Sequence, residues 1–436
     1  MEAMGKQQRE EVLLRAASDG NLRLLKKMAR WMGSGGQGEA AVLAAVEDGE
    51  GGRPLHLAAG AGRVEVCRYL VEDLRLDVNQ LNCQGHTPLY LSAYFGRAAA
   101  ARYLLDHGAD PLASKLRSPL YGAAMQGHCE MLEMLLSRGL DVDLNSVQGT
   151  ALHAAACYKQ HGIMKILLEH HADPNKVCYL NNTPLSLAMR QRDMSTELLE
   201  CAKLLIKAGA DVNFIDLDGD TYVTVAAMFG YPGIMKCLLD AGANPNIPDE
   251  YGRTPIEFAA SNGSRDMVEM LFPLTSPIST LPDWSIDGII SHVKHYGLKP
   301  RDKQKCAKRR TELKQKALKA FKEEEYFIAA LLYSCAIALD PSPDEYATLL
   351  ANRSLCCLRT KNGRAALPDA TICRRARPFW PKACYREGSA FMLLKDYEKA
   401  CKAFADGLKL DPTNGDLANA LREAQEAAKD ARRPEK

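Results

Sequence analysis

The sequence predicts an all-α protein in which two different arrays of helical repeats follow one another. A Pro-Leu pair or its substitute recurs from Pro54 to Pro255, at spacings of 34, 31, 32, 33, 38 and 33 residues. A second period follows, because Pro341, Pro378 and Pro412 are separated by 37 and 34 residues. Fixed periods of this length indicate stacked repeats, each made of one small helical unit. A hydrophobic fraction of 47% and a charged fraction of 25% are typical of a soluble folded protein.

Residues 1–46 come first and are polar and mixed in charge. They lack the apolar stretch and cleavage site of a signal peptide. The chain also contains no apolar run of about 18 residues, the minimum for a membrane helix, so we expect no membrane insertion. We expect the later part of this segment, from about residue 10, to form a degenerate unit that caps the first array.

Residues 47–275 contain seven recognisable units of the first array, and each unit has the same physical logic. Thr-Pro begins a helix, with Thr as the cap and Pro at the first position. Ala-Ala keeps that helix thin, and a second helix carries a Leu-Leu pair for the core. Glycine then ends the second helix in a left-handed conformation, as at Gly108, Gly139, Gly209 and Gly242. These units resemble the ankyrin repeat family, which implies a solenoid that binds another protein.

Three aromatic residues of this array are candidate contacts for that protein. The second variable position of the Ala-Ala-x-x-Gly element is aromatic in alternate repeats, at Phe95, Tyr158 and Phe229. The resemblance implies that this position faces the concave surface, and aromatic residues often dominate protein interfaces. Packing between repeats is an equally good explanation. The partner itself is unidentified, because the ankyrin fold has no fixed ligand code.

Residues 276–305 interrupt both periods and are expected to form a linker. Four prolines fall between residues 272 and 300, and they break any long helix. We expect one short helix near 285–295.

Residues 306–436 contain three units of the second array and a final helix near 416–431. Small residues recur where two helices would cross, large ones fill the space between them, and Pro closes each unit. The clearest stretch is KDYEKACKAFADGLKLDPTN. These units resemble the tetratricopeptide repeat family, which implies a superhelix with a groove lined by the first helix of each unit. The order of the two arrays resembles that of plant ankyrin–tetratricopeptide proteins.

The resemblance also implies a binding site in that groove. Four positions match a carboxylate clamp of co-chaperone tetratricopeptide domains: Lys314, Asn352, Lys382 and Arg386. In that family the clamp binds the acidic Glu-Glu-Val-Asp tail of the cytosolic seventy- and ninety-kilodalton heat-shock chaperones (Hsp70 and Hsp90). Hydrogen bonds to charged groups contribute about 1.5–3 kcal/mol each, so a few would support micromolar binding, about −8 kcal/mol. The family's fifth position is an asparagine, but here it is Leu318, which removes one contact to the terminal carboxylate. Solvated cations without a ligand are the alternative.

Charge and cysteine content bear on partners and compartment. Residues 301–436 hold 28 Lys and Arg against 19 Asp and Glu, whereas the rest of the chain is net acidic, which suggests different partners for the two arrays. The stretch 299–322 carries eleven cations and two acids. It could be a nuclear signal or a nucleic-acid patch, but without interleaved aromatics we favour a solvated helix and expect no nucleic acid. Fourteen scattered cysteines without a CxxC pair indicate reduced thiols in the cytoplasm, with nuclear entry also open.

These observations predict a non-enzymatic adaptor without a cofactor or metal. No phosphate-binding loop, nucleophile elbow or metal-binding helix is visible in the sequence. The second array would hold a chaperone tail while the ankyrin array binds another protein, and this tethering would raise their effective concentration. The alternative is a scaffold or targeting subunit of another complex, whose tetratricopeptide groove does not bind chaperones.

Overall fold

The computed structural model describes residues 5–33, 36, 38–49, 51–114, 116–178, 181–190, 196–216, 219–300 and 302–432. Its contacts divide the chain into two compact units, which are described separately. One unit comprises residues 1–58, 63–87 and 302–436, and the other comprises residues 59–62 and 88–301. Within the described residues the regular elements are helices, together with two isolated bridges at Ser146–Gly149 and Ile215–Thr221. The predicted all-α class is confirmed.

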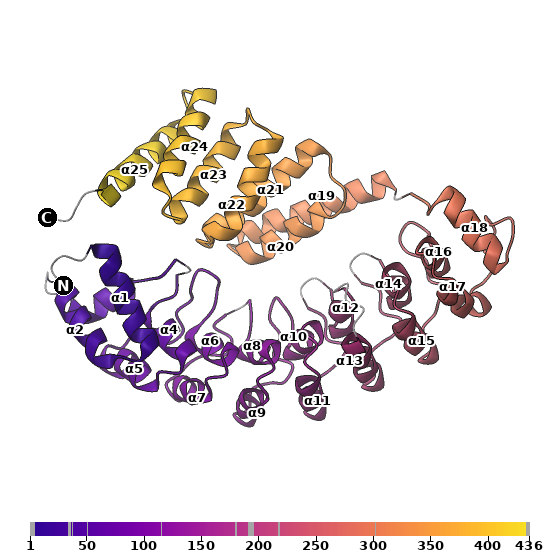
Figure 1. The fold of residues 1–436 in the computed structure, drawn as a ribbon, viewed down its shortest axis with the longest axis horizontal. Coiled ribbons are helices and arrows are strands. Elements are labelled where there is room, and N and C mark those ends of the chain that lie inside the picture. The colour runs from indigo at the N-terminus through magenta and orange to yellow at the C-terminus, as the bar shows by residue number, and fades with distance from the viewer. Residues whose placement is uncertain are drawn as a thin grey trace. The chain divides into compact units, whose positions relative to one another are not determined.

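The chain begins with three short helices: α1 (Lys6–Asp19), α2 (Leu22–Gly33) and α3 (Gly38–Ala45) (Figure 1). Helix α2 packs against both α1 and α3. Their apolar faces are buried, with Leu13, Leu25 and Leu43 fully inaccessible to solvent. Gly20 ends α1 in the left-handed conformation that favours glycine.

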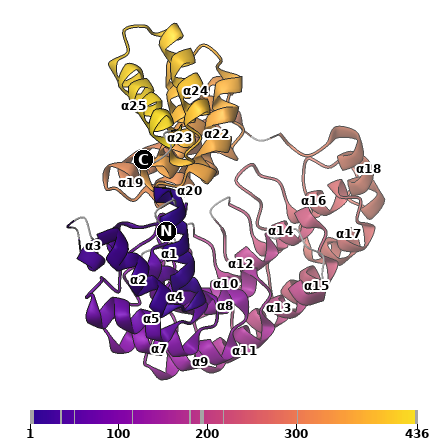
Figure 2. The same ribbon diagram turned by 60° about the vertical axis from the view of Figure 1, so that its left-hand side comes forward.

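Seven helix pairs follow and make up the ankyrin repeats. Figure 1 and Figure 2 show that the first and second helices from α6 to α17 form two parallel rows. The first helices are α4 (Pro54–Ala61), α6 (Pro88–Tyr94), α8 (Pro119–Gln126), α10 (Ala151–Cys157), α12 (Pro184–Met189), α14 (Tyr222–Phe229) and α16 (Pro255–Ser261). The second helices are α5 (Val64–Arg68), α7 (Ala98–Asp106), α9 (Cys129–Ser137), α11 (His161–Glu169), α13 (Thr196–Lys207), α15 (Pro232–Asp240) and α17 (Arg265–Leu271).

The start of each first helix follows from its cap. The hydroxyl of Thr183 accepts a hydrogen bond from the Ser186 N–H, and the Thr183 N–H donates to the Ser186 hydroxyl at 2.8 Å. At α16 the carboxylate of Glu257 accepts both the N–H and the hydroxyl of Thr254, each at 2.8 Å. These reciprocal pairs satisfy N–H groups that a helix start leaves without partners. The Thr-Pro prediction is therefore confirmed at both positions.

Two buried histidines complete the same turns in other repeats. Nδ1 of His153 accepts the Thr150 N–H at 3.1 Å, and Nε2 lies 2.9 Å from the carbonyl oxygen of Asn182. His56 lies in the equivalent position, with Nε2 2.9 Å from the Gln80 carbonyl oxygen. Burial lowers the pKa of each ring to about 4, so both are neutral and structural at pH 7.

The hairpins between repeats are joined by short side chains that reach the next backbone. Asn175 donates to the Gly209 carbonyl at 2.9 Å and accepts the Asp211 N–H at 2.7 Å. Asn246 makes the same pair of bonds to Leu274 and Ser276. We call this set the hairpin ladder. These bonds satisfy backbone N–H and C=O groups that would otherwise bond to water, and they fix the spacing of adjacent repeats.

Six of the seven second helices end in a left-handed residue, which is glycine at the four predicted positions, whereas α17 continues into a 3₁₀ turn. Two repeats depart from this rule. Arg75 and His171 occupy the equivalent positions with φ of 53° and 63°. Before Arg75, helix α5 continues as a π-helical turn, η1 (Tyr69–Asp73). A residue with a Cβ is strained in this conformation, so these two turns are held by their surroundings.

The last ankyrin pair is followed by a 3₁₀ turn, η2 (Phe272–Leu274), and by α18 (Ile286–Tyr296). Ser285 caps α18 by accepting the Gly288 N–H at 3.0 Å. Ile289 and Val293 are buried, and α18 packs against α16 and α17. Phe272 stacks on Trp284 with ring centres 5.4 Å apart. This segment therefore covers the end of the ankyrin stack.

The remaining helices form three antiparallel pairs and a final helix, each packed on its neighbours in sequence. The pairs are α19 (Lys303–Lys322) with α20 (Tyr326–Ile337), α21 (Pro343–Arg359) with α22 (Gly363–Ala376), and α23 (Pro381–Leu393) with α24 (Tyr397–Leu410), followed by α25 (Gly415–Arg432). The predicted small residues lie at the helix crossings, where Ala317, Ala329 and Ala366 are fully buried. The hydroxyl of Ser354 donates to the Ala366 carbonyl at 3.0 Å across one crossing.

Candidate functional site

The first helix of each C-terminal pair carries the residues predicted to bind a peptide carboxylate. Lys314 lies on α19, Asn352 on α21, and Lys382 and Arg386 on α23. Helices α21 and α23 are held together by a buried cluster that includes Leu350, Ala351 and Ala383, with Tyr346 and Trp380 packed against it. Among the described residues, no direct hydrogen bond joins the four predicted side chains to one another.

Arg386 is the most unusual of these residues because its charge is buried without a counter-ion. The residue is 8% exposed, and its Nε has no hydrogen-bond partner. In the part of the chain that the structure describes, Arg386 forms no ion pair with a carboxylate. Burial lowers its pKa, and the nearby guanidinium of Arg359 lowers it further. A buried cation without a counter-ion costs free energy, so this position favours the arrival of an anion.

Lys382 lies one turn before Arg386 and extends the same positive region. Partial burial lowers the pKa of Lys382, and repulsion from Arg386 adds to that effect. Its Nζ lies 5.9 Å from the ring centre of Trp380, whose other neighbour is the guanidinium of Arg377 at 4.5 Å. Like Arg386, Lys382 has no carboxylate partner in the described ranges. The α23 side of the site is therefore an uncompensated cationic region.

Asn352 adds a neutral hydrogen-bonding group from α21. It is a neighbour of Tyr333, a residue of α20 that is 2% exposed. Burial raises the pKa of Tyr333 to about 12, although the Asn352 amide acts to lower it. A side-chain amide can accept or donate a hydrogen bond without adding charge.

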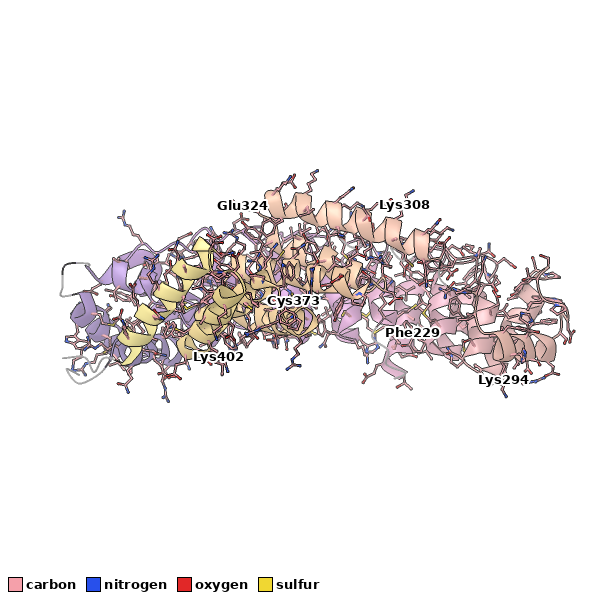
Figure 3. The ribbon with its side chains drawn as sticks, turned by 90° about the horizontal axis from the view of Figure 1, so that it is seen from above. Phe229, Lys294, Lys308, Glu324, Cys373 and Lys402 are labelled. Carbon is pink, nitrogen blue, oxygen red and sulfur yellow. The ribbon has the colours of Figure 1, made fainter. Side chains whose placement is uncertain are left out.

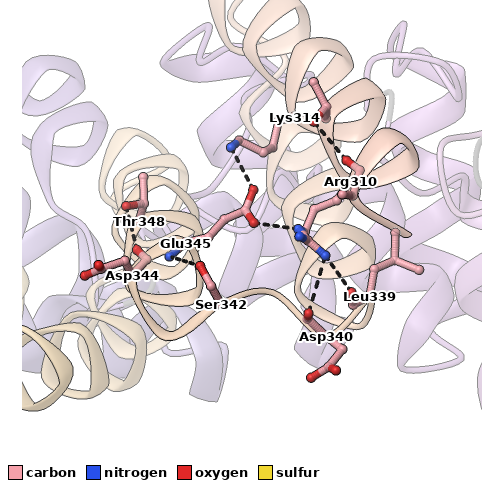
Figure 4. Close-up of polar contacts among 10 residues, drawn as sticks. Arg310, Lys314, Leu339, Asp340, Ser342, Asp344, Glu345 and Thr348 are labelled. Atoms are coloured by element: carbon pink, nitrogen blue, oxygen red, sulfur yellow. Dashed lines mark hydrogen bonds and ion pairs between the residues drawn. The ribbon is translucent and has the colours of Figure 1, made fainter. Parts of the chain in front are cut away.

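Lys314 is in a different situation, which the sequence did not reveal. Its Nζ lies 3.0 Å from Oε1 of Glu345, a residue in the first turn of α21 (Figure 4). The other oxygen, Oε2, accepts a 2.7 Å bond from Nε of Arg310. Burial alone would raise the pKa of Glu345, but the bonds from Lys314 and Arg310 outweigh it and hold that pKa below its usual value. Lys314 is thus already paired with a carboxylate of the same chain.

Leu318 lies one turn beyond Lys314 on α19 and is 49% exposed. It offers an apolar side chain where the resemblance implies an amide. The predicted site therefore has two chemically different ends. The α23 end is cationic and unpaired, whereas the α19 end combines a neutralised lysine with an exposed leucine. This arrangement can bind an anionic group at one end and an apolar side chain at the other.

Helix α19 also carries basic side chains that are exposed to solvent. Lys303, Lys308, Lys316 and Lys322 of α19 are exposed, although they are spread around the helix, and Lys308 is labelled in Figure 3. One exposed ion pair, Lys319 with Glu323, lies at its end at 3.9 Å. The helix contains a single aromatic residue, Phe321, which packs on Tyr326 with ring centres 5.1 Å apart. These features agree with a solvated helix.

The three predicted aromatic contacts of the ankyrin stack differ in exposure. Phe95 and Tyr158 are 48% and 43% exposed, whereas Phe229 is half-buried (Figure 3). Phe95 packs edge-on against Tyr94, with ring centres 4.9 Å apart. Phe229 lies beside Tyr231 at 6.0 Å and lines a cavity of about 740 Å³ together with Pro232. Phe95 and Tyr158 are thus accessible to a partner, whereas a larger part of the Phe229 side chain is covered by neighbouring residues.

The guanidinium of Arg117 lies near Tyr158. Nε of Arg117 donates to Gln148 at 3.3 Å, and Nη1 donates to the hydroxyl of Tyr90 at 3.4 Å. In another repeat the equivalent residue, Arg253, is paired instead with the buried carboxylate of Asp249 at 2.6 Å. Arg117 has no such carboxylate among the described residues. The aromatic surface therefore includes a cation held only by neutral groups.

Two other kinds of site are absent from the residues that the structure describes. No cluster of three or more His, Cys, Asp and Glu side chains has the geometry to hold a metal ion. No helix in these ranges is long and apolar enough to cross a membrane.

Stacked helix pairs and a site built from surface side chains define this chain as a helical repeat protein. A family model described as ankyrin repeats (3 copies) matches residues 13–115, 120–216 and 194–279. These matches cover more than half of the sequence, and the chain belongs to the ankyrin repeat family.

Curated relatives extend the comparison. Protein STIP1 homolog of Dictyostelium discoideum is 38% identical over 128 residues, which are 29% of this chain and 22% of that protein. Heat shock protein sti1 homolog of Schizosaccharomyces pombe is 37% identical over 116 residues, 27% of this chain and 19% of that protein. Tetratricopeptide repeat protein 28 of Mus musculus is 37% identical over 100 residues, 23% of this chain and 4% of that protein.

The chain thus spans less than a quarter of the length of these curated relatives. Together with the three helix pairs from α19 to α24, the similarities identify tetratricopeptide repeats in addition to the ankyrin repeats. The chain is a repeat protein of the kind that mediates protein–protein interaction.

Proposed function

We propose that this chain is a non-enzymatic co-chaperone-like adaptor. Its tetratricopeptide groove binds the acidic C-terminal peptide of an Hsp90 or Hsp70 chaperone in the cytoplasm, while its ankyrin array binds a second protein. The observation that carries the proposal is Arg386, a cation that is 8% exposed and has no counter-ion among the residues that the structure describes. Such a residue is costly in the free protein and becomes favourable when a carboxylate reaches it.

The neighbours of Arg386 support a peptide carboxylate as the ligand. Arg386 offers a planar guanidinium for bidentate contact, Lys382 offers a mobile ammonium, and Asn352 offers a neutral amide. The names of two relatives, a STIP1 homolog and a heat shock protein sti1 homolog, add support for a chaperone-related role. The exposed rings of Phe95 and Tyr158 are the proposed contacts for the second protein.

The test is a calorimetric titration of the full chain with the peptide Met-Glu-Glu-Val-Asp and with its C-terminally amidated form. We expect micromolar binding of the free acid, a loss of about tenfold or more on amidation, and a similar loss in the K382A/R386A variant. K402A is the matched control, because Lys402 is an exposed cation on α24 (Figure 3). It should bind as the wild type does.

Two results would contradict the proposal. Absence of binding by the wild-type chain would leave a scaffold whose groove takes another ligand. K402A removes one charge and K382A/R386A removes two, so a loss of binding free energy in K402A about half as large as in the double variant would show that the peptide responds only to overall charge.

A further inference from the structure

The carboxylate of Glu345, in the first turn of α21, binds two cations of α19 and so joins the two helices. Its Oε1 lies 3.0 Å from Nζ of Lys314, and its Oε2 lies 2.7 Å from Nε of Arg310 (Figure 4). The side chains of Glu345 and Lys314 are 23% and 32% exposed, so the pair is partly shielded from water. Both bonds are therefore stronger than those of a fully exposed surface pair.

The surrounding structure holds Glu345 in this position. Ser342 caps α21 and accepts the Glu345 N–H at 3.3 Å. Arg310 is 9% exposed and donates from Nη1 to the Leu339 carbonyl at 2.8 Å, which fixes the guanidinium that binds Oε2. A carboxylate in the first turn of a helix is also favoured by the helix dipole. Glu345 thus occupies Lys314 without any rearrangement of the chain.

The other cations of the predicted clamp have no such partner. Arg386 and Lys382 form no ion pair within the described residues, and Arg386 is buried. One chain therefore contains a clamp position that is filled by an internal carboxylate and two that are open. Lys314, Lys382 and Arg386 all carry a positive charge. An incoming carboxylate must compete with Glu345 at Lys314, but it meets no internal carboxylate of the described residues at Lys382 and Arg386.

We infer that Glu345 is an internal competitor for the peptide carboxylate and sets the specificity of the groove. It already binds Lys314, so acidic side chains gain less at the α19 end and bind mainly through Arg386 and Lys382. The exposed Leu318, one turn beyond Lys314, then favours a ligand with an apolar residue at that end. This inference rests on the proposed function, because it concerns how the same groove selects among acidic peptides.

A double-mutant cycle on the full chain tests this competition, with Met-Glu-Glu-Val-Asp as the probe. E345Q keeps the size and one acceptor oxygen but removes the charge, and we expect it to bind the peptide up to about tenfold more tightly. K314A should weaken binding less than about twofold in the wild type, but by most of the gained affinity in the E345Q background. E323Q is the matched control, because it removes an equal charge from the exposed pair with Lys319.

The outcomes distinguish failure of this inference from failure of the proposed function. If E345Q binds more tightly and only the E345Q background depends on Lys314, the inference is supported. Binding by E345Q without binding by the wild type also supports the inference, because Glu345 would then prevent the peptide from binding to the groove. Wild-type binding with full dependence on Lys314, or with no gain in E345Q, overturns the inference and leaves the proposed function standing. No binding by either protein, with both folded by circular dichroism, overturns both.

Discussion

Gly388 of α23 lies directly against the ring of Phe404 of α24. A Cβ atom at position 388 would stand 2.5 Å from Cε1 and 2.6 Å from Cδ1 of that ring. Phe404 is 1% exposed and belongs to a buried cluster with Ala400 and Leu417, so the ring has little freedom to move away. The closeness of the last tetratricopeptide pair therefore depends on the absence of a single methyl group.

Replacing this glycine tests the packing of that pair. Gly388→Ala should destabilise the C-terminal helices by about 1–3 kcal/mol, because the new methyl forces the Phe404 ring or the backbone to shift. Urea unfolding of the full chain, followed by circular dichroism, measures the change. Gly415→Ala is the control, since no atom lies within 4 Å of a Cβ there. Equal effects of the two changes would contradict the role of Phe404.

The buried charge of Arg386 predicts opposite effects on stability and on binding. Arg386→Met keeps an extended apolar side chain but removes the cation that lacks a counter-ion. We expect the free energy of unfolding to rise by about 1 kcal/mol, while affinity for an acidic peptide falls by about tenfold or more. Thermal denaturation and calorimetry check the two effects. Lys402→Met, at an exposed site, should change neither, and a loss of stability in Arg386→Met would show that the cation has an internal partner.

His171 lies in a left-handed turn that is glycine in four other repeats. Its φ of 63° strains a residue with a Cβ, so His171→Gly should stabilise the ankyrin stack by about 0.5–1 kcal/mol. The neighbouring His170 caps α11 with φ of −85° and provides the control. His170→Gly should be neutral or destabilising in the same urea titration. A loss of stability in His171→Gly would mean that its ring makes contacts that outweigh the strain.

The two buried histidines predict that the ankyrin repeats lose stability in mild acid. The pKa values of His56 and His153 fall from 6.5 to about 4 on folding, so the unfolded state binds protons that the folded state does not. Stability is therefore complete above pH 6.5 and declines as the pH falls from 6.5 towards 4. At the lower end the loss approaches about 3 kcal/mol for each ring.

Unfolding free energies measured at pH 7 and pH 5 check this expectation. His56→Gln and His153→Gln should lower stability at pH 7 and flatten the pH dependence. His170→Gln, at an exposed ring, should retain the wild-type slope. A stability that is constant between pH 7 and pH 5 would contradict the expectation.

The sequence was sufficient to predict the repeats, and particular residues show why. Thr183-Pro184 and Thr254-Pro255 specify helix starts by local chemistry, and Ala317 and Ala366 mark crossings by their size. Such features act within one unit and recur with its period. The left-handed turn at Arg75 and the π-helical turn before it differ from the other repeats, and no residue in the local sequence predicts them.

The candidate site was predicted less completely, because its electrostatics depend on contacts between units. The period placed Lys314 on the first helix of its pair, but Glu345 lies 31 residues away and binds it through side chains. The tetratricopeptide repeat pattern does not predict which side chains of different units form an ion pair. Burial without a partner at Arg386 is likewise a property of packing, which the spacing of Lys382 and Arg386 alone could not show.

The hairpin ladder has a mechanical consequence for an adaptor held at both ends. Each of its bonds joins one repeat only to the next, as Asn175 joins Gly209 and Asp211. A load applied along the stack passes through these links in series, so the extension of the whole is the sum of small local displacements. Because each stacked repeat contacts only its neighbours, the array lengthens elastically through small displacements between repeats, while each hairpin keeps its own geometry.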